Sequence, residues 1–252
     1  MDNRPTVEVC FTPNLYPLHK DNAEIVVVID VLRATSAICT AFANGVEKVI
    51  PVSTVEEALK YKEKGFLVAA ERKGQVVPGF KFGNSPYSYM GKNLSGKTLV
   101  ITTTNGTKAF HTANQAKSVV IGSLNNLDAV SKFLMNQGKN VLLLASGWKN
   151  KFCLEDTICA GAISDQLLNS GNFAAEQDST IAAKYLYISA KENYLGYLKS
   201  SSHRRRLKKL NLNEDIKYCL TPNLTDVVPI RENNYLVKTG LIFSVVSDAL
   251  YE

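Results

Sequence analysis

An α/β fold with a largely parallel sheet is predicted by two features of this 252-residue chain. Short runs rich in valine and isoleucine recur along it, and they are almost continuously apolar, as expected for strands covered on both faces. Segments with helical patterns separate most of these runs, and such alternation is typical of parallel sheets. We therefore expect a three-layer α/β/α arrangement with a largely parallel, mixed central sheet and a helical C-terminal region.

The expected elements alternate in order along the chain. Strands are predicted over 6–11, 25–30, 48–52, 66–70, 98–103, 118–122 and 141–146. Helices are predicted over 34–45, 53–65, 108–116, 125–138 and 157–168. Asn44-Gly45, Gly65 and Gly138 are typical helix stops, and Ser53 or Thr54 is expected as an N-cap. Beyond about residue 175 the chain becomes mostly helical and more charged, and 226–230 and 234–240 suggest one or two late strands.

Composition narrows the class of protein. The formal net charge of +6 suits an anionic substrate or a nucleic acid, although many soluble proteins carry such an excess. No apolar run reaches membrane-spanning length and the first residues lack a signal-peptide layout, so we expect a cytoplasmic protein without a membrane partner. The length and the absence of a Pro- or Ser-rich linker favour a single α/β domain over residues 1–252.

The residues able to bind a metal point to a hard cation. Five scattered cysteines without a CxxC pair indicate neither a disulfide framework nor a zinc cluster, and the chain has only three histidines. Oxygen ligands and a cation such as Mg²⁺ are therefore the better expectation. The stretch GKNLSGKT (91–98) matches a phosphate-loop pattern, but a strand follows it where a helix is needed, so we interpret it as a turn.

Polar loops follow three of the predicted strands: DVLRATS (30–36), TTTNGT (102–107) and SGWKNKFCLED (146–156). In an open parallel sheet such loops lie at the carboxyl ends of strands, where ligands bind. Each loop also has a simpler interpretation. In the first, Asp30 and Arg33 form a local ion pair or Asp30 caps a helix; the second is a plain turn with an N-cap. In the third, the acidic residues are those favoured at the start of a helix. Their coincidence favours a site, as does the long 70–86 loop, which we interpret as a binding loop rather than a surface excursion.

Three further features are given structural interpretations. The basic run HRRRLKK (203–209) is expected to be a solvated helix face, since no nucleic-acid-binding motif accompanies it. The tyrosines at 185, 187, 194 and 197 are expected to pack between helices. Cys153 lies beside acidic residues without an obvious base, which disfavours a thiol nucleophile.

Four ordered blocks, DVLRATS, AERKG…GFKFGNSP, TTTNGT and LEDTICAG, together with SSH…L…DIKYC…VP, resemble the 2-phosphosulfolactate phosphatase family over roughly residues 25–230. The resemblance implies a Mg²⁺-dependent phosphatase with a three-layer α/β/α fold. Such an enzyme would hydrolyse 2-phospho-3-sulfolactate to 3-sulfolactate and phosphate, a step toward coenzyme M. The chain departs from the pattern at Ala70, Lys73 and Arg204, where glycine is usual, and Lys73 would add positive charge at the pocket mouth.

The resemblance implies that these loops form a site for a small polyanionic phosphorylated acid. Asp30, Glu155 and Asp156 are expected to hold Mg²⁺, directly or through water, while Arg33 and Arg72 bind anionic oxygens. Neutral donors are expected from Thr35, Ser36, Asn105, Gly106 and Thr107, and closure of the pocket from Asn84 and Ser85. Asp30 is alternatively a nucleophile that forms an aspartyl-phosphate.

A non-catalytic anion-binding or regulatory protein on the same scaffold is the competing hypothesis, and a homodimer is the default expectation for assembly.

Overall fold

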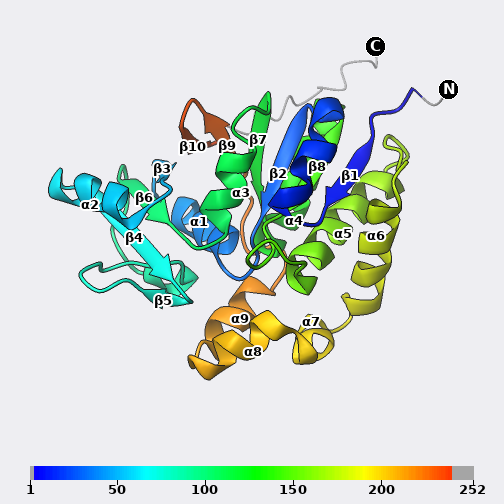
Figure 1. Ribbon diagram of the computed structural model, residues 1–252. Coiled ribbons are helices and arrows are strands. Elements are labelled where there is room, and N and C mark those ends of the chain that lie inside the picture. Colours follow the sequence, from blue (N-terminus) through cyan, green and yellow to red (C-terminus); the bar gives the residue numbers. More distant parts are fainter. Residues whose placement is uncertain (1–2, 240–252) are drawn as a thin grey trace, which may run out of the picture.

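The computed structural model describes residues 3–239 (Figure 1). Within that range the strands are β1 (Val7–Cys10), β2 (Ile25–Ile29), β3 (Lys48–Pro51), β4 (Leu67–Arg72), β5 (Gln75–Val76), β6 (Thr98–Thr102), β7 (Ser118–Gly122), β8 (Val141–Ala145), β9 (Pro229–Glu232) and β10 (Tyr235–Lys238). The α-helices are α1 (Ala34–Ala43), α2 (Val55–Glu63), α3 (Gly106–Thr112), α4 (Leu127–Gln137), α5 (Leu154–Asn169), α6 (Asp178–Ala190), α7 (Tyr194–Tyr197), α8 (Ser202–Lys209) and α9 (Asn213–Cys219). Short 3₁₀ helices span Pro13–Leu18, Lys20–Asn22, Pro86–Ser88, Leu124–Asn126 and Leu198–Ser200.

The predicted α/β class is confirmed, and the expected strands and helices are present with small shifts at their ends. The Asn44-Gly45 pair ends α1, and Thr54 caps α2 by accepting a hydrogen bond of 3.1 Å from the backbone N–H of Glu57. The 91–98 stretch forms a turn before β6, as interpreted from the sequence. Residues 1–2 and 240–252 of the expected domain lie outside the described residues.

The sheet order is β1-β8-β2-β7-β9-β10-β3-β6-β4-β5. Two groups are internally parallel: β1, β8, β2 and β7 form one, and β3, β6 and β4 form the other. The late hairpin β9–β10 lies between them and pairs antiparallel with β7 on one side and β3 on the other. The last two strands among residues 3–239 therefore join the two groups at the middle of the sheet.

This hairpin reverses the strand direction between the two groups, since the steps from β7 to β9, β10 and β3 are all antiparallel. In Figure 1, β4 and β6 lie steeply inclined to β2 and β8, so the carboxyl ends of both groups approach one another below the centre of the sheet. A Cβ atom added to Gly106, which follows β6, would lie 2.9 Å from Oδ2 of Asp30, which follows β2. The inclination of the two strand groups thus brings the loop after β6 close to the loop after β2.

Helices cover both faces of the sheet. One buried apolar cluster joins residues of β1, β2, β7 and β8 to α4, α5 and α6, and a second joins the opposite face to α1 and α3. The strands β2 and β8 are buried at every residue, which explains their continuous apolar runs. Helices α8 and α9 lie below the sheet in Figure 1 and close the end where the polar loops emerge.

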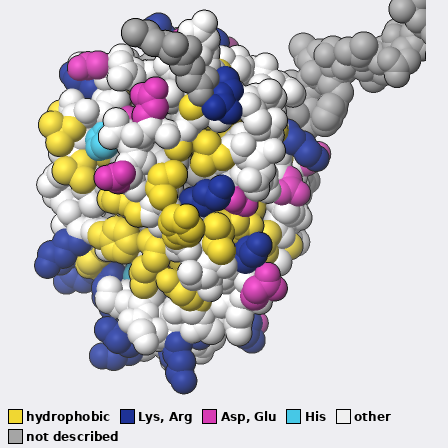
Figure 2. All heavy atoms as spheres, turned by 90° about the vertical axis from the view of Figure 1, so that its right-hand side faces the viewer, with side chains coloured by type: hydrophobic (Ala, Val, Ile, Leu, Met, Phe, Trp, Pro, Cys, Tyr) yellow, Lys and Arg dark blue, Asp and Glu magenta, His cyan; other side chains and the backbone are white. Residues whose placement is uncertain are grey.

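The outer side of α6 remains exposed. Ile181, Tyr185 and Ile188 are spaced along one helix face, and Tyr185 is 64% exposed. Figure 2, which views this side of the molecule, shows hydrophobic side chains gathered over it, with lysines and arginines toward the lower end. Tyr187 and Tyr194 pack against the core as expected, whereas Tyr185 and Tyr197 are exposed. Among residues 3–239, no helix has the length and apolar character needed to span a bilayer.

Close packing of α5 against α6 depends on Gly161. A Cβ atom at this position would lie 2.0 Å from the carbonyl oxygen of Ala183 and 3.0 Å from Cβ of Tyr187, so the two helices would have to separate. We predict that Gly161→Ala lowers the free energy of unfolding by about 1–3 kcal/mol, as overpacking does, despite its better helix propensity. Urea unfolding measures this. Ser189→Ala, at an exposed position of α6, is the control; an unchanged midpoint for Gly161→Ala would contradict the packing argument.

Candidate active site

A cavity of about 560 Å³ opens where the polar loops meet α8. Its walls come from the segments that follow β2, β6 and β8, from the end of β4 and the turn after it, and from one face of α8. The lining residues are Asp30, Leu32, Arg33, Glu71, Arg72, Lys73, Gly74, Asn84, Thr104, Asn105, Trp148, Lys149, His203, Arg206, Leu207 and Leu210. Both parallel strand groups and the C-terminal helices therefore contribute to one pocket.

Asp30 is held at the junction of β2 and α1 by local hydrogen bonds. Its backbone N–H donates to Oγ1 of Thr35 at 3.1 Å, its carbonyl accepts from the N–H of Thr35 at 2.9 Å, and its Oδ1 accepts from the N–H of Ala34 at 3.3 Å. The side chain is buried, and this burial raises the pKa of Asp30 to about 6. His203 and the Ala34 N–H oppose the shift, while the charges of Glu71 and Glu155 add to it.

Glu71 is a second buried carboxylate that lines the cavity. One oxygen accepts from the backbone N–H of Gly74, and the other accepts from the N–H of Thr104 at 3.2 Å. The hydroxyl of Thr104 also lies within hydrogen-bond distance of both oxygens, at 3.4 and 3.3 Å. Glu71 thereby ties the turn after β4 to the loop after β6.

Asp156 lies behind the cavity wall at the start of α5. Its Oδ1 accepts from the N–H of Val31 at 2.9 Å, and its Oδ2 accepts from the N–H of Gly147 at 3.0 Å. Each carboxylate oxygen thus holds one loop, after β2 and after β8 respectively. Burial and the charges of Glu155 and Asp30 raise the pKa of Asp156 well above its usual value, against the effect of the two amides.

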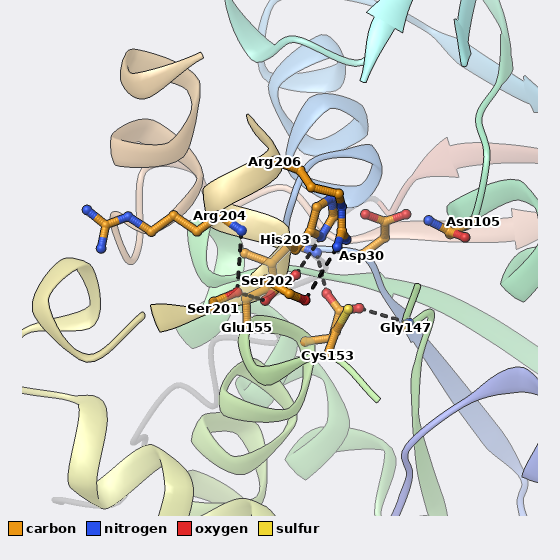
Figure 3. A network of polar contacts seen from close by, with 12 residues as sticks. Asp30, Asn105, Gly147, Cys153, Glu155, Ser201, Ser202, His203, Arg204 and Arg206 are labelled. Atoms are coloured by element: carbon orange, nitrogen blue, oxygen red, sulfur yellow. Dashed lines mark hydrogen bonds and ion pairs between the residues drawn. The ribbon is translucent and has the colours of Figure 1, made fainter. Parts of the chain in front are cut away.

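Glu155, the neighbouring residue, is engaged by α8. Its Oε1 lies 2.6 Å from Nδ1 of His203, and its Oε2 accepts from the hydroxyl of Ser201 at 3.3 Å. Burial raises the pKa of Glu155, but the hydrogen bond and charge of His203 outweigh that effect and the net shift is downward. Since Nδ1 is occupied by Glu155, the imidazole is oriented with its other nitrogen free for the cavity it lines (Figure 3).

The two predicted arginines line the cavity with their guanidinium groups already engaged. Arg33 pairs with Asp215 at 2.5 Å and donates to the carbonyl of Gly74 at 2.7 Å. Arg72 donates to the carbonyl of Glu71 at 2.7 Å and to Oγ1 of Thr102 at 3.0 Å. Each guanidinium has five N–H groups, so both keep donors for an anion.

The predicted neutral residues divide into two sets. Asn84 and Asn105 line the cavity, and Oδ1 of Asn84 is buried without a hydrogen-bond partner. The others lie outside the lining and support the loops. The hydroxyl groups of Thr35, Ser36 and Thr107 form hydrogen bonds with nearby backbone atoms. Gly106 packs beside Asp30, and Ser85 precedes the 3₁₀ turn that begins at Pro86.

A known protein family matches most of this chain. The model of the 2-phosphosulpholactate phosphatase family matches residues 10–234. The chain belongs to the 2-phosphosulfolactate phosphatase family. Its membership confirms the resemblance of the sequence blocks and identifies a phosphoric monoester hydrolase.

Curated relatives share this family over most of their length. A probable 2-phosphosulfolactate phosphatase of Caldanaerobacter subterraneus subsp. tengcongensis is 40% identical over 222 residues, covering 86% of this chain and 91% of the relative. A protein of the same description from Nostoc punctiforme is 38% identical over 237 residues, covering 90% and 96%. One from Clostridium perfringens is 41% identical over 211 residues, covering 81% and 85%.

Several cavity residues of this phosphatase family member were not selected from the sequence. His203 and Arg206 come from the basic run, which is not simply a solvated face, and Trp148 and Lys149 come from the loop after β8. The SSH block contained the signal for His203. For Arg206 and Trp148 the sequence held no signal, because their contact depends on the docking of α8 against the β8 loop. Lys73 lines the cavity, as its position suggested.

One group in this phosphatase offers closely spaced metal-binding atoms. Among residues 3–239, Cys153, Glu155 and His203 each place one such atom within 4.8 Å of the others. Asp30 and Asp156 lie outside this group, so the expected set of three carboxylates is split between the cavity and the wall behind it. Burial and the neighbouring carboxylates raise the pKa of the Cys153 thiol, which keeps it protonated and unsuited to nucleophilic attack.

Burial of the Asp30 charge makes stability depend on pH. The folded-state pKa of about 6 lies above the ordinary value of 3.8, so the folded protein binds this proton more tightly than the unfolded chain. The stability gained from the protonated form is therefore complete below about pH 4 and is lost as the pH rises to about 6.

We predict that Asp30→Asn stabilises the metal-free protein by about 2–3 kcal/mol at pH 8 and by progressively less toward pH 4. Chemical unfolding in EDTA at several pH values measures this. Asp226→Asn, at an exposed loop position, serves as the control. A gain for Asp30→Asn that does not change with pH would contradict the assigned cost of the buried charge.

Proposed function

We propose that this chain is a Mg²⁺-dependent phosphatase that hydrolyses 2-phospho-3-sulfolactate, or a closely related phosphorylated acid, to 3-sulfolactate and phosphate, a step toward coenzyme M. The observation that carries the proposal is a buried carboxylate, Asp30, in a cavity lined by cationic side chains. These are Arg33, Arg72, Lys73, Lys149 and Arg206. The names of the relatives supply the substrate. The expected cytoplasmic location and homodimeric assembly stay predictions from the sequence.

The donor chemistry of the cavity fits a hard divalent cation. Asp30, Glu71 and Asn84 line it with oxygen atoms, and Oδ1 of Asn84 is buried without a partner. Burial and, after it, the charges of neighbouring carboxylates raise the pKa values of Asp30 and Asp156. A cation held by Asp30, with Glu155 and Asp156 as charged neighbours behind it, would relieve this repulsion. When bound, Mg²⁺ supplies positive charge to the phosphoryl oxygens.

The cationic residues account for binding of a polyanion. Phosphoryl transfer requires neutralisation of the phosphate charge and an in-line approach of the attacking oxygen. Arg33 is fixed by Asp215 and Gly74, and Arg72 is fixed by Thr102, so both present their remaining N–H groups from defined positions. This rigidity orients the phosphate against Asp30.

Asp30 and His203 are the residues proposed to take part in nucleophilic attack and proton transfer. In one route the Asp30 carboxylate attacks phosphorus, the bond to the sulfolactate oxygen breaks, and water then cleaves the aspartyl-phosphate. In the other route water attacks phosphorus directly, and Asp30 would instead serve as a ligand of the cation. In both, His203 donates a proton to the departing alkoxide while Glu155 holds its ring. Borohydride trapping separates the routes, because it converts an aspartyl-phosphate at position 30 to homoserine.

Phosphate release tests the proposed function. We predict that the protein releases phosphate from 2-phospho-3-sulfolactate with Mg²⁺ and loses this activity in EDTA. Asp30→Asn should lower kcat/KM by roughly 10³-fold or more, since it removes the group at the reacting phosphorus. Asp226→Asn should leave it unchanged. Binding of the substrate without phosphate release, across a range of divalent cations, would instead support the anion-binding hypothesis.

His203 generates a separate prediction. Removal of a general acid typically costs 10²–10⁴-fold in rate, so we expect His203→Asn to lower kcat by roughly that factor. The loss should be smaller for a substrate with an acidic leaving group, such as p-nitrophenyl phosphate, which needs no proton on departure. His19→Asn, at a partly buried position beside Glu8 and outside the cavity lining, is the control. An equal loss on both substrates would indicate that His203 has a structural role only.

A further inference from the structure

Arg206 is the arginine of the basic run that lines the cavity and leaves two of its three nitrogen atoms without a hydrogen-bond partner. It lines the cavity from α8, and its Nε and Nη2 atoms are both buried without a hydrogen-bond partner. Its Nη1 donates to Oγ of Ser202 at 3.4 Å. The residue as a whole is partly buried, but two buried donor atoms without partners are costly, and unsatisfied groups of this kind call for an explanation such as a missing ligand.

The neighbouring aromatic residue fixes the plane of this guanidinium. Cζ of Arg206 lies 4.1 Å from the centre of the Trp148 ring, and the Trp148 and His203 rings are 5.3 Å apart. Nζ of Lys149 lies 5.9 Å from the same indole ring. Figure 3 shows the Arg206 side chain running from α8 toward His203 and Asp30. Stacking on Trp148 therefore holds a cation beside the proposed reacting groups.

The two unpartnered atoms are chemically matched to an oxoanion. In arginine, the N–H of Nε and one N–H of Nη2 lie on the same edge of the planar group, and this edge binds carboxylates and similar anions through two parallel hydrogen bonds. We propose that Arg206, oriented by Trp148, binds the non-reacting oxoanion of the substrate and so determines specificity. This inference rests on the proposed function, because it names the part of that substrate that Arg206 binds.

The two preceding arginines of the run do not share this arrangement. Arg204 donates from Nη1 to the carbonyl of Leu195, and Arg205 is exposed on α8 outside the cavity lining. Arg33 and Arg72 are fixed by protein partners on the β2 and β4 side of the cavity. Arg206, by contrast, comes from the C-terminal helices, so it suits a second anionic group on the same molecule.

Three substrates identify the group that Arg206 binds: 2-phospho-3-sulfolactate, 2-phospholactate, which lacks the sulfonate, and the phosphate ester of isethionate, which lacks the carboxylate. We expect Arg206→Met to lower kcat/KM for 2-phospho-3-sulfolactate roughly 10- to 100-fold, the range for loss of charged hydrogen bonds. The penalty should shrink for the one substrate that lacks the bound group. Shrinkage with 2-phospholactate assigns the sulfonate, and shrinkage with the isethionate ester assigns the carboxylate.

Arg206→Lys should recover only part of the loss, because lysine keeps the charge but not the planar edge. Arg205→Met is the matched control and should behave as wild type. An equal penalty on all three substrates, or no penalty, would overturn the proposal. If the wild-type protein releases no phosphate, the proposed function fails, but the role of Arg206 can still be tested. Calorimetry then measures the affinity for 3-sulfolactate, and equal affinity of the wild type and Arg206→Met would refute the role of Arg206.

Discussion

The burial of four carboxylates, Asp30, Glu71, Glu155 and Asp156, is the constraint on which this structure depends. Charges removed from water need compensation, and the protein supplies it differently at each position. Two backbone amides hold Asp156, the amides of Gly74 and Thr104 hold Glu71, and His203 holds Glu155. The bonds of Asp156 join the loops after β2 and β8, those of Glu71 join the loops after β4 and β6, and His203 brings α8 to Glu155. Arg33 links the two pairs of loops by donating to the carbonyl of Gly74. The site is therefore built by the same contacts that satisfy its acids.

Asp30 accepts the fewest protein hydrogen bonds of the four. Its side-chain oxygens accept one protein hydrogen bond, from Ala34 at 3.3 Å, and its pKa is raised. A carboxylate left in this condition interacts strongly with a cation or an electrophilic phosphorus, because either one lowers the cost of its charge. The carboxylate with the fewest protein hydrogen bonds is thus the one where the proposed chemistry occurs, while the surrounding acids are tied into the framework.

The sequence predicted the strands and most helices because their apolar runs and stop residues are local signals, but it did not predict the sheet order. Nothing local indicates that Pro229–Glu232 and Tyr235–Lys238 enter the middle of the sheet, between strands from the first half of the chain. The loops with Asp30, Glu71 and Asn105 were found because strand ends in α/β folds are known ligand positions. The supporting role of Asp156 was not found, since a carboxylate that binds two amides has the same sequence pattern as a metal ligand.

The central hairpin also explains why the C-terminal helices belong to the site. Because β9 and β10 must reach the middle of the sheet, the chain between α6 and β9 crosses the end where the polar loops emerge, and α8 and α9 form there. Asp215 on α9 then neutralises Arg33, and His203 on α8 engages Glu155. Arg206, one turn after His203, has no acidic partner of this kind among the described residues. The segment between α6 and β9 therefore supplies the partners of Arg33 and Glu155 and also brings Arg206 to the cavity without an acidic partner. A cation of this kind is expected of a group that binds an anionic substrate.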